Sequence, residues 1–216
     1  MLRSMWFPKG DAGGQWDEAI VFLSDRSPVM KRIITHVGPC TLARKRDAYV
    51  SLVQSILSQQ VSMAAAASMY NKLKASLPDK RVTPGRVTDF LRDADEQQLR
   101  DCGLSRQKRR YVKELTERFV DGRVPLKQFR KMSDQQIIES LTDCVGVGLW
   151  TAQMFLMFTL NRPDVWPVGD LGLRQNVVNH LGVKDREDWE AVETIGLPFS
   201  PWRTVACWYL WRSSEK

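Results

Sequence analysis

The strongest chemical signal in the sequence is a short run that holds two glycines between two expected helices. It reads Thr142-Asp-Cys-Val-Gly146-Val-Gly148-Leu-Trp-Thr151-Ala. Glycine reaches positive φ values and leaves the backbone uncovered. The N–H groups at the start of the second helix could then bind a phosphate, and Thr151 could add a hydroxyl. The alternative interpretation is a plain glycine turn between two helices.

Asp164 and Asp170 are the first two carboxylates downstream of this run. A carboxylate can stabilise positive charge that develops on a reacting carbon. However, Asp170 stands directly before Leu-Gly-Leu-Arg, and an Asp in front of a helix is a normal N-cap. Its nearest competitor, Asp164, lies beside Pro163 and is typical of a turn. From residue type alone, the cap is the simpler interpretation of Asp170.

Cysteine and histidine usage disfavours several other kinds of chemistry. The four cysteines are widely and irregularly spaced, at positions 40, 102, 144 and 207, with no CxxC pair. This spacing disfavours a disulfide framework, a zinc ribbon and a four-cysteine iron–sulfur loop. Neither of the two histidines lies in an HxE or HExxH context. Zinc chemistry and a Ser–His–Asp hydrolase are therefore also disfavoured.

Helices joined by short polar turns must position these residues. Apolar spacing and capping residues predict helices at about 46–59, from Ser62 to about Leu77, at 95–102, from Ser105 to near Gly122, at 134–142, and from about Leu149. Ser133 with Gln136 matches a capping box at the head of 134–142. Strand signals are nearly absent. We therefore predict an all-α protein of roughly nine to eleven helices.

Composition limits the class of protein further. The chain has 216 residues, of which 43% are hydrophobic and 26% are charged, as in an ordinary globular protein of one large domain or two lobes. No apolar run approaches the roughly 20 residues that span a bilayer, and the first residues lack the apolar core of a secretory signal. The net charge of +7 favours a polyanionic partner, of which nucleic acid is the commonest, although a functionally neutral basic surface fits equally well.

Four blocks of the sequence resemble segments of the HhH-GPD superfamily of base-excision DNA glycosylases, and they occur along the chain in the same order as in that family. The blocks are ILSQQVS at 56–62, the glycine run at 142–152, VWPVGDLGLR at 165–174 and SPWRTVACWYLW at 200–211. The last block resembles the closing helix of the 3-methyladenine DNA glycosylase II branch. The resemblance implies a two-lobed, all-α helix-hairpin-helix fold with the active-site cleft between the lobes. It implies one module over 1–216, with a middle lobe at about 41–162 and a second lobe from 1–40 plus 163–216.

The resemblance implies that Asp170 is the catalytic residue. Its carboxylate would stabilise an oxocarbenium-like sugar and orient or deprotonate the attacking water. Trp150 stands where bifunctional relatives carry a lysine, and a tryptophan cannot act as an amine nucleophile. We therefore expect a monofunctional glycosylase that leaves an abasic site and has no lyase activity. Bifunctional relatives often carry an iron–sulfur cluster, which the cysteine spacing disfavours here, so we expect no required cofactor.

The resemblance also places Trp150 and Trp211 on the walls of a pocket for the damaged base. An indole face attracts cationic bases such as 3-methyladenine and 7-methylguanine. Core packing is the alternative for each tryptophan, and for Trp211 the two interpretations are about equal. Met154 stands where relatives can have a tyrosine, which predicts a softer pocket.

Double-stranded DNA with a damaged base is the expected partner. Gln60 would fill the space that an extruded base leaves, with a surface residue at a helix end as the alternative. Lys108 and Arg109 lie in the densest basic cluster, at 106–110, and either contact flanking phosphates or form a solvated face. The expected DNA contacts are Gln60, Gly146, Gly148, Thr151, Lys108 and Arg109.

Three further expectations rest on the resemblance. The backbone carbonyls of Thr142, Cys144 and Val147 would hold a structural Na⁺ or K⁺ ion. We expect a monomer without membrane association, located in the cytoplasm of a bacterium or the nucleus of a eukaryote. Two alternatives remain open: a glycosylase for uracil, hypoxanthine or ethenoadenine, and a non-catalytic DNA-structure-binding protein in which Asp170 is only a cap.

Overall fold

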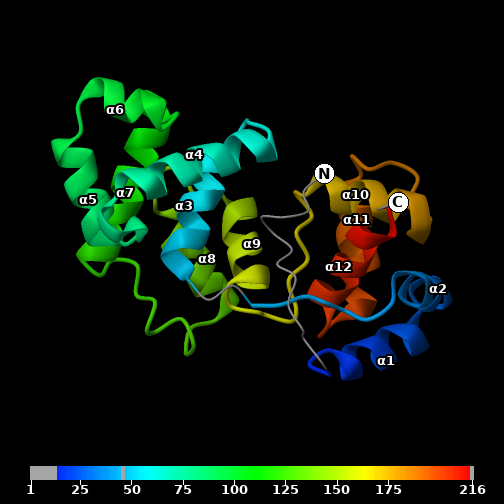
Figure 1. The fold of residues 1–216 in the computed structure, drawn as a ribbon. Coiled ribbons are helices and arrows are strands. Elements are labelled where there is room, and N and C mark those ends of the chain that lie inside the picture. The colour runs from blue at the N-terminus through cyan, green and yellow to red at the C-terminus, as the bar shows by residue number, and fades with distance from the viewer. Residues whose placement is uncertain (1–13, 45–46, 215–216) are drawn as a thin grey trace. The chain divides into compact units, whose positions relative to one another are not determined.

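The computed structural model describes residues 14–44 and 47–214 and confirms the all-α class. These residues form twelve α-helices and two short 3₁₀ helices, and they contain no strand (Figure 1). The number of α-helices is slightly above the expected nine to eleven. No helix in the described ranges is long and apolar enough to cross a membrane.

The chain divides into two compact units. Among the described residues, unit 1 comprises 47–155, and unit 2 comprises 14–44 and 156–214. Unit 1 contains α3 (Ala48–Ser58), α4 (Met63–Ser76), η1 (Pro78–Lys80), α5 (Pro84–Asp93), α6 (Glu96–Asp101), α7 (Arg106–Val120), α8 (Asp134–Thr142) and the first part of α9 (Leu149–Phe158). Unit 2 contains the end of α9 together with α1 (Asp17–Arg26), α2 (Pro28–Val37), α10 (Leu171–Leu181), α11 (Trp189–Gly196), η2 (Leu197–Phe199) and α12 (Arg203–Ser213).

Unit 1 is organised around α3, which packs against α4 and α7. Leu52, Ile56 and Leu57 on this helix have no exposed surface, so its apolar residues form the centre of the core. A buried hydrogen bond of 2.8 Å joins the Tyr49 hydroxyl on α3 to the Thr116 hydroxyl on α7. This bond satisfies two polar groups that would be costly to bury alone.

Unit 2 is organised around α12, on which every residue from 204 to 210 is buried. This helix packs against α2 and α10. A helix that is apolar on nearly all sides lies in the middle of its unit. The Tyr209 hydroxyl donates a 3.0 Å hydrogen bond to the carbonyl of Gly38, which closes the C-terminal end of α2.

Local capping signals predicted the helix boundaries of unit 1 well. Ser62 accepts a hydrogen bond from the backbone of Ala65 at the head of α4, and Ser133 with Gln136 forms the expected capping box of α8. The sequence pattern did not predict α5, because this helix begins with Pro84 and Gly85, two residues that favour turns. Proline is nevertheless tolerated at the first helical position, where its missing N–H would have had no partner.

Candidate active site

Asp170 lies at the N-terminus of α10 and is buried, with 6% of its surface exposed. Its backbone N–H donates to the carbonyl of Pro167 at 2.8 Å, which fixes the turn that leads into the helix. Its Oδ1 accepts a hydrogen bond of 2.7 Å from the backbone N–H of Leu173. The expected N-cap is therefore confirmed. A cap does not exclude catalysis, because one carboxylate oxygen can hold the helix while the group as a whole carries its negative charge.

Trp211 on α12 contacts the same carboxylate oxygen. Its indole Nε1–H donates a hydrogen bond of 2.9 Å to Oδ1 of Asp170. The Trp211 ring also stacks on Phe158, with ring centroids 6.0 Å apart and an interplanar angle of 26°. Trp211 is partly exposed. It is therefore not only a core residue, because its polar edge orients Asp170 while one ring face packs on an aromatic neighbour.

Gly172 leaves space for the contact between Asp170 and Trp211. The sequence analysis did not predict this role of Gly172. A Cβ atom at this position would lie 3.1 Å from Oδ1 of Asp170 and 3.3 Å from the Trp211 ring. Both distances are tighter than ordinary van der Waals contact. A glycine inside a helix costs about 1 kcal/mol relative to alanine, so its presence in the first turn of α10 was the available signal.

Cys207 on α12 is fully buried and lies near Asp170. Burial raises the pKa of its thiol well above the usual value, and the negative charge of Asp170 raises it further. The thiol is therefore neutral at physiological pH. A neutral thiol is a poor nucleophile, so Asp170 is the group of the two that can act on developing positive charge.

Asp164, the other carboxylate in this part of the chain, is held in a structural ion pair. Its Oδ1 lies 2.7 Å from Nε of Arg203, and its Oδ2 accepts from the Ser200 hydroxyl at 2.9 Å. Burial disfavours the charged carboxyl, but these hydrogen bonds outweigh it and hold the pKa of Asp164 below its usual value. Asp164 therefore joins the loop before α10 to the start of α12.

The glycine run forms the turn between α8 and α9 in unit 1. Gly146 has φ of +92°, and a Cβ there would overlap the ring of Tyr111 on α7, so glycine is required at this position. Gly148 does not have the expected positive φ, because it directly precedes α9 and its carbonyl already accepts from Ala152 at 3.0 Å. Gly148 is exposed, and a Cβ there would meet nothing within 4 Å. The backbone is therefore open at Gly148.

Thr151, Trp150 and Met154 follow on α9. Thr151 is buried, with 5% of its surface exposed, so its hydroxyl adds little to the open surface of the turn. Trp150 is half-buried in the first turn of the helix. Met154, one turn later, is 2% exposed and belongs to the core.

Gln60 lies in the turn between α3 and α4 and is exposed. It has φ of +58°, which is uncommon for a residue with a side chain. The preceding residue, Gln59, donates from Nε2 to the carbonyl of Gly146 at 2.8 Å. The structure therefore brings the Gln60 turn and the glycine run together, although they are far apart in the sequence.

Lys108 and Arg109 both have partners inside unit 1. The ammonium of Lys108 donates to carbonyls at the end of α3, including that of Gln59 at 3.0 Å. Arg109 donates to the carbonyl of Leu104 at 2.7 Å and pairs with Glu96 at 2.6 Å. The basic cluster thus contains two residues that stabilise the fold, and no phosphate contact follows from their placement.

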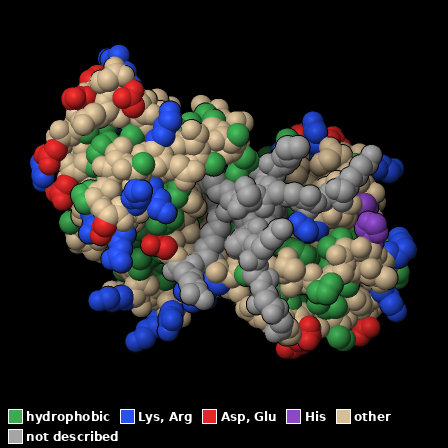
Figure 2. All heavy atoms as spheres, in the orientation of Figure 1, with side chains coloured by type: hydrophobic (Ala, Val, Ile, Leu, Met, Phe, Trp, Pro, Cys, Tyr) green, Lys and Arg blue, Asp and Glu red, His purple; other side chains and the backbone are tan. Residues whose placement is uncertain are grey.

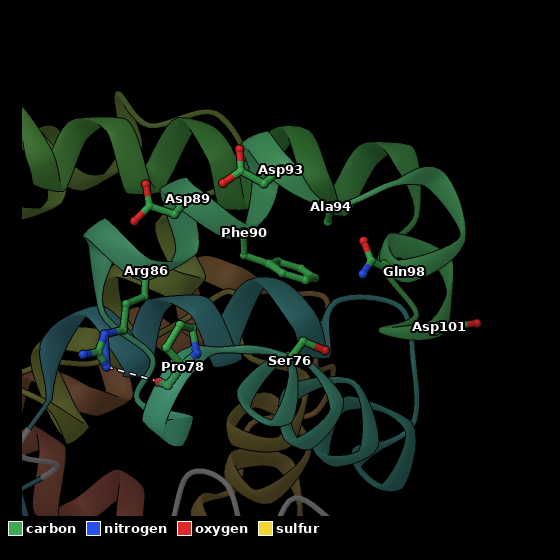
Figure 3. A pocket seen from close by; sticks show the side chains of 9 residues that line it. All are labelled: Ser76, Pro78, Arg86, Asp89, Phe90, Asp93, Ala94, Gln98 and Asp101. Atoms are coloured by element: carbon green, nitrogen blue, oxygen red, sulfur yellow. Dashed lines mark hydrogen bonds between the residues drawn. The ribbon is translucent and has the colours of Figure 1, made fainter.

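A hollow of about 450 Å³ in unit 1 contains none of the predicted site residues. It is lined by Ser76, Pro78, Arg86, Asp89, Phe90, Asp93, Ala94, Gln98 and Asp101 (Figure 3). On the face shown in Figure 2, acidic and basic side chains lie side by side over the α5–α6 end of this unit. Asp89 and Asp93 in its lining pair with Arg92 at 3.0 and 2.7 Å, so these carboxylates are compensated within unit 1.

Comparison with known proteins assigns the family. The model of the HhH-GPD superfamily of base excision DNA repair proteins matches residues 53–199. The alkylbase DNA glycosidase-like protein mag2 of Schizosaccharomyces pombe is 33% identical over 185 residues, which cover 83% of this chain and 85% of that protein. DNA-3-methyladenine glycosylase 1 of the same organism is 32% identical over 206 residues, which cover 92% of this chain and 87% of that protein.

A solved structure agrees with the sequence match. The structure of Schizosaccharomyces pombe 3-methyladenine DNA glycosylase (Mag1) in complex with abasic-DNA superimposes with a TM-score of 0.78 and 30% sequence identity. The superposition covers 92% of this chain and all of that one. This chain therefore belongs to the HhH-GPD superfamily of base excision DNA repair proteins.

Proposed function

We propose that this protein is a monofunctional DNA glycosylase that removes alkylated bases, such as 3-methyladenine and 7-methylguanine, from double-stranded DNA. It would flip the damaged base, hydrolyse the N-glycosidic bond and leave an abasic site. The observation that carries this proposal is the buried Asp170 carboxylate, which the N–H groups of Leu173 and Trp211 hold in one orientation. The relatives named as alkylbase or 3-methyladenine glycosylases support the substrate class.

Asp170 would act on the sugar. Cleavage of an N-glycosidic bond builds positive charge on the deoxyribose, and a fixed carboxylate stabilises that charge without having to reorient. The same carboxylate would orient or deprotonate the attacking water. Because Leu173 and Trp211 both donate to Oδ1, the plane of the carboxylate is set before DNA binds.

The indole rings of Trp150 and Trp211 would favour a damaged base that carries positive charge. Alkylation at N3 or N7 places positive charge on the purine ring, and an indole face attracts such a ring. The charged base is also a good leaving group, so little acid catalysis is needed. Trp150 stands in place of an amine nucleophile, and we therefore propose that no Schiff base forms and that the strand is not cut.

The open backbone of the glycine run would contact the DNA strand. Gly148 is exposed, directly precedes α9 and has free space where a side chain would begin. Backbone N–H groups at a helix N-terminus bind phosphate without reading the base. Gln60, exposed in the neighbouring turn, would occupy the space that the flipped base leaves. This arrangement needs one copy of the chain, and we propose a monomer.

A monovalent cation at the hairpin remains part of the proposal. The carbonyls of Thr142, Cys144 and Val147, which the resemblance assigns to this ion, would hold Na⁺ or K⁺. The Cys144 carbonyl also accepts a hydrogen bond of 3.0 Å from the backbone N–H of Val147. A hard cation prefers such oxygen ligands, and its charge would strengthen the attraction for phosphate. If a cation is bound at this site, replacement of Na⁺ and K⁺ in the buffer by a large organic cation should weaken DNA binding.

The decisive experiment measures release of free base from a methylated duplex by the wild type, Asp170→Asn and Asp188→Asn. Asp188 is a matched control, because its Oδ1 caps α11 in the same unit at 3.0 Å from the backbone N–H of Ala191. We expect release by the wild type and by Asp188→Asn, and none by Asp170→Asn. Equal rates for the two variants would refute the role of Asp170. Parallel duplexes with uracil, hypoxanthine or ethenoadenine define the range of lesions.

A further inference from the structure

The C-terminal end of α3 is held by one lysine side chain. The ammonium of Lys108 donates to the carbonyls of Ile56 at 3.4 Å, Leu57, and Gln59 at 3.0 Å. The last carbonyls of a helix have no partner within the helix, and a cation beside them is favourable. Lys108 reaches these groups from the first turn of α7, about 50 residues away in the sequence. Its side chain is therefore a built-in cap for α3.

The residue that follows this cap has a strained backbone. Gln60 has φ of +58°, and the left-handed region is unfavourable for a residue with a Cβ. Such a conformation persists when its surroundings fix it. The groups that fix it stand directly before it, because Lys108 holds the Gln59 carbonyl and the Gln59 side chain holds the Gly146 carbonyl at 2.8 Å.

The same face of α7 also supports the glycine run. Tyr111, one turn after Lys108, fills the space where Gly146 would carry a side chain. The Tyr111 hydroxyl accepts a hydrogen bond of 2.7 Å from Nε2 of Gln107 on the same helix. Helix α7 therefore supports both turns of unit 1 that the proposed function assigns to DNA.

We propose that Lys108 is a positioning residue for Gln60, so that the side chain of Gln60 is preset to occupy the space left by a flipped base. This inference rests on the proposed function. It replaces the simpler interpretation of Lys108 as a phosphate contact, because the ammonium already donates to the carbonyls of α3. The loss of Lys108 should therefore matter most when a base must be forced out of an intact pair.

The test compares two substrates in single-turnover excision assays. In one, the methylated base lies opposite its normal partner; in the other, it lies opposite an abasic site, where no orphaned base is left to be contacted. Lys108→Met removes the charge and keeps the apolar stem. We expect it to slow excision from the paired substrate by about tenfold or more, as for the loss of a hydrogen bond to a charged group, and to change the second rate little.

The ratio of the two rates is the decisive quantity, because the active fraction of a preparation cancels from it. Lys113→Met is the matched control, since Lys113 is exposed on the same helix and its loss removes one charge. Any effect of this variant should be equal on both substrates. If Lys108→Met does not fold, Lys108→Gln keeps donor groups at this position and should give a smaller change in the ratio.

A double-mutant cycle with Gln60→Ala completes the test. Because Lys108 acts through Gln60, the double variant should lose no more activity than Gln60→Ala alone. The salt dependence of DNA binding should be the same for Lys108→Met and the wild type, since no phosphate contact is lost. An unchanged rate ratio, additive effects with Gln60→Ala or a reduced salt dependence would overturn the proposal. If the wild type released no base from either substrate, the proposed function itself would fail.

Discussion

Asp170 serves both as the cap of α10 and as the proposed catalytic carboxylate, and two substitutions separate these roles. Asp170→Asn keeps an oxygen that can accept from both Leu173 and Trp211, while Asp170→Ala removes it. Asparagine and aspartate are about equally good N-caps. The first substitution therefore removes mainly the charge, and the second removes the charge and the cap together.

The structure sets the expected size of each effect on stability. Loss of an N-cap costs about 1 kcal/mol, and the part-buried indole N–H of Trp211, left without its acceptor, costs about 1–3 kcal/mol more. For Asp170→Ala we expect the free energy of unfolding to fall by about 2 to 4 kcal/mol, which lowers Tm by roughly 5 to 15 °C in a chain of this size. For Asp170→Asn we expect a loss below about 1 kcal/mol.

The effect on catalysis should not follow the effect on stability. Removal of a carboxylate that acts on the transition state costs about 10²- to 10⁴-fold in rate, so both variants should be nearly inactive. Binding to abasic product DNA should stay within a small factor of the wild type for Asp170→Asn. The assays are base release under single turnover, thermal unfolding and fluorescence anisotropy with labelled duplex.

One outcome would refute this reasoning. If Asp170→Asn keeps a rate near that of the wild type while Asp170→Ala loses both activity and stability, the carboxylate acts only as a cap. Activity would then depend on the correctly folded N-terminus of α10, and a group other than Asp170 would act on the sugar. Asp188→Asn shows what replacement of an exposed capping carboxylate does by itself.

Four further predictions concern other parts of the molecule. With Trp150 in place of an amine, borohydride should trap no enzyme–DNA adduct, and the product strand should break only after alkali; an enzyme-dependent nick would contradict this. Trp150→Ala should reduce excision of methylated purines more than it reduces binding to abasic product, and a wild type that removes uracil rapidly but ignores methylated purines would overturn the lesion assignment. Gly146→Ala should lower Tm, because φ is +92° at this position. Gly148→Ala should fold normally, because its Cβ would meet no atom within 4 Å, but that Cβ would obstruct the approach of the DNA strand and weaken binding to all duplexes in anisotropy titrations. Unchanged affinity of Gly148→Ala would make the turn structural only. The pKa of Asp164 is lowered in the folded state, so its ionised carboxylate stabilises the fold fully above the unfolded pKa near 3.8. This stabilisation is lost as pH falls through the folded pKa. Arg203→Met, which removes the partner, should therefore flatten the decrease of Tm below about pH 4; an unchanged decrease would contradict this.

The parts of the fold that the sequence predicted are those set by local interactions. The caps at Ser62 and Ser133 act within three residues of themselves, so their residue types alone indicate where α4 and α8 begin. The turn between α8 and α9 was predictable for the same reason, since the positive φ of Gly146 is set within the turn itself. The contact with Tyr111 on α7, which also excludes a side chain at Gly146, was not predictable in this way.

The parts that could not be predicted depend on contacts between distant residues. Lys108 stands in a run of basic residues, and nothing in that run distinguishes a phosphate ligand from a cap for a helix about 50 positions earlier. The hydrogen bond from Trp211 to Asp170 joins residues 41 positions apart, so the sequence left pocket and core packing equally open for Trp211. The close approach of Asp170 and Trp211 that favours glycine at position 172 depends on the same distant contact.

The burial of the cysteines bears on how the protein would respond to the methylating agents that damage DNA. All four cysteines are free and buried, and burial raises the pKa of the Cys40 thiol to about 12 and that of Cys144 to about 11. Electrophiles that methylate purines also attack thiolates, which are the reactive form of cysteine. Because the folded chain exposes no cysteine and keeps the thiols of Cys40 and Cys144 protonated, methylating agents should leave its cysteines largely unmodified. The cysteines would then survive the same chemical exposure that creates the proposed substrates.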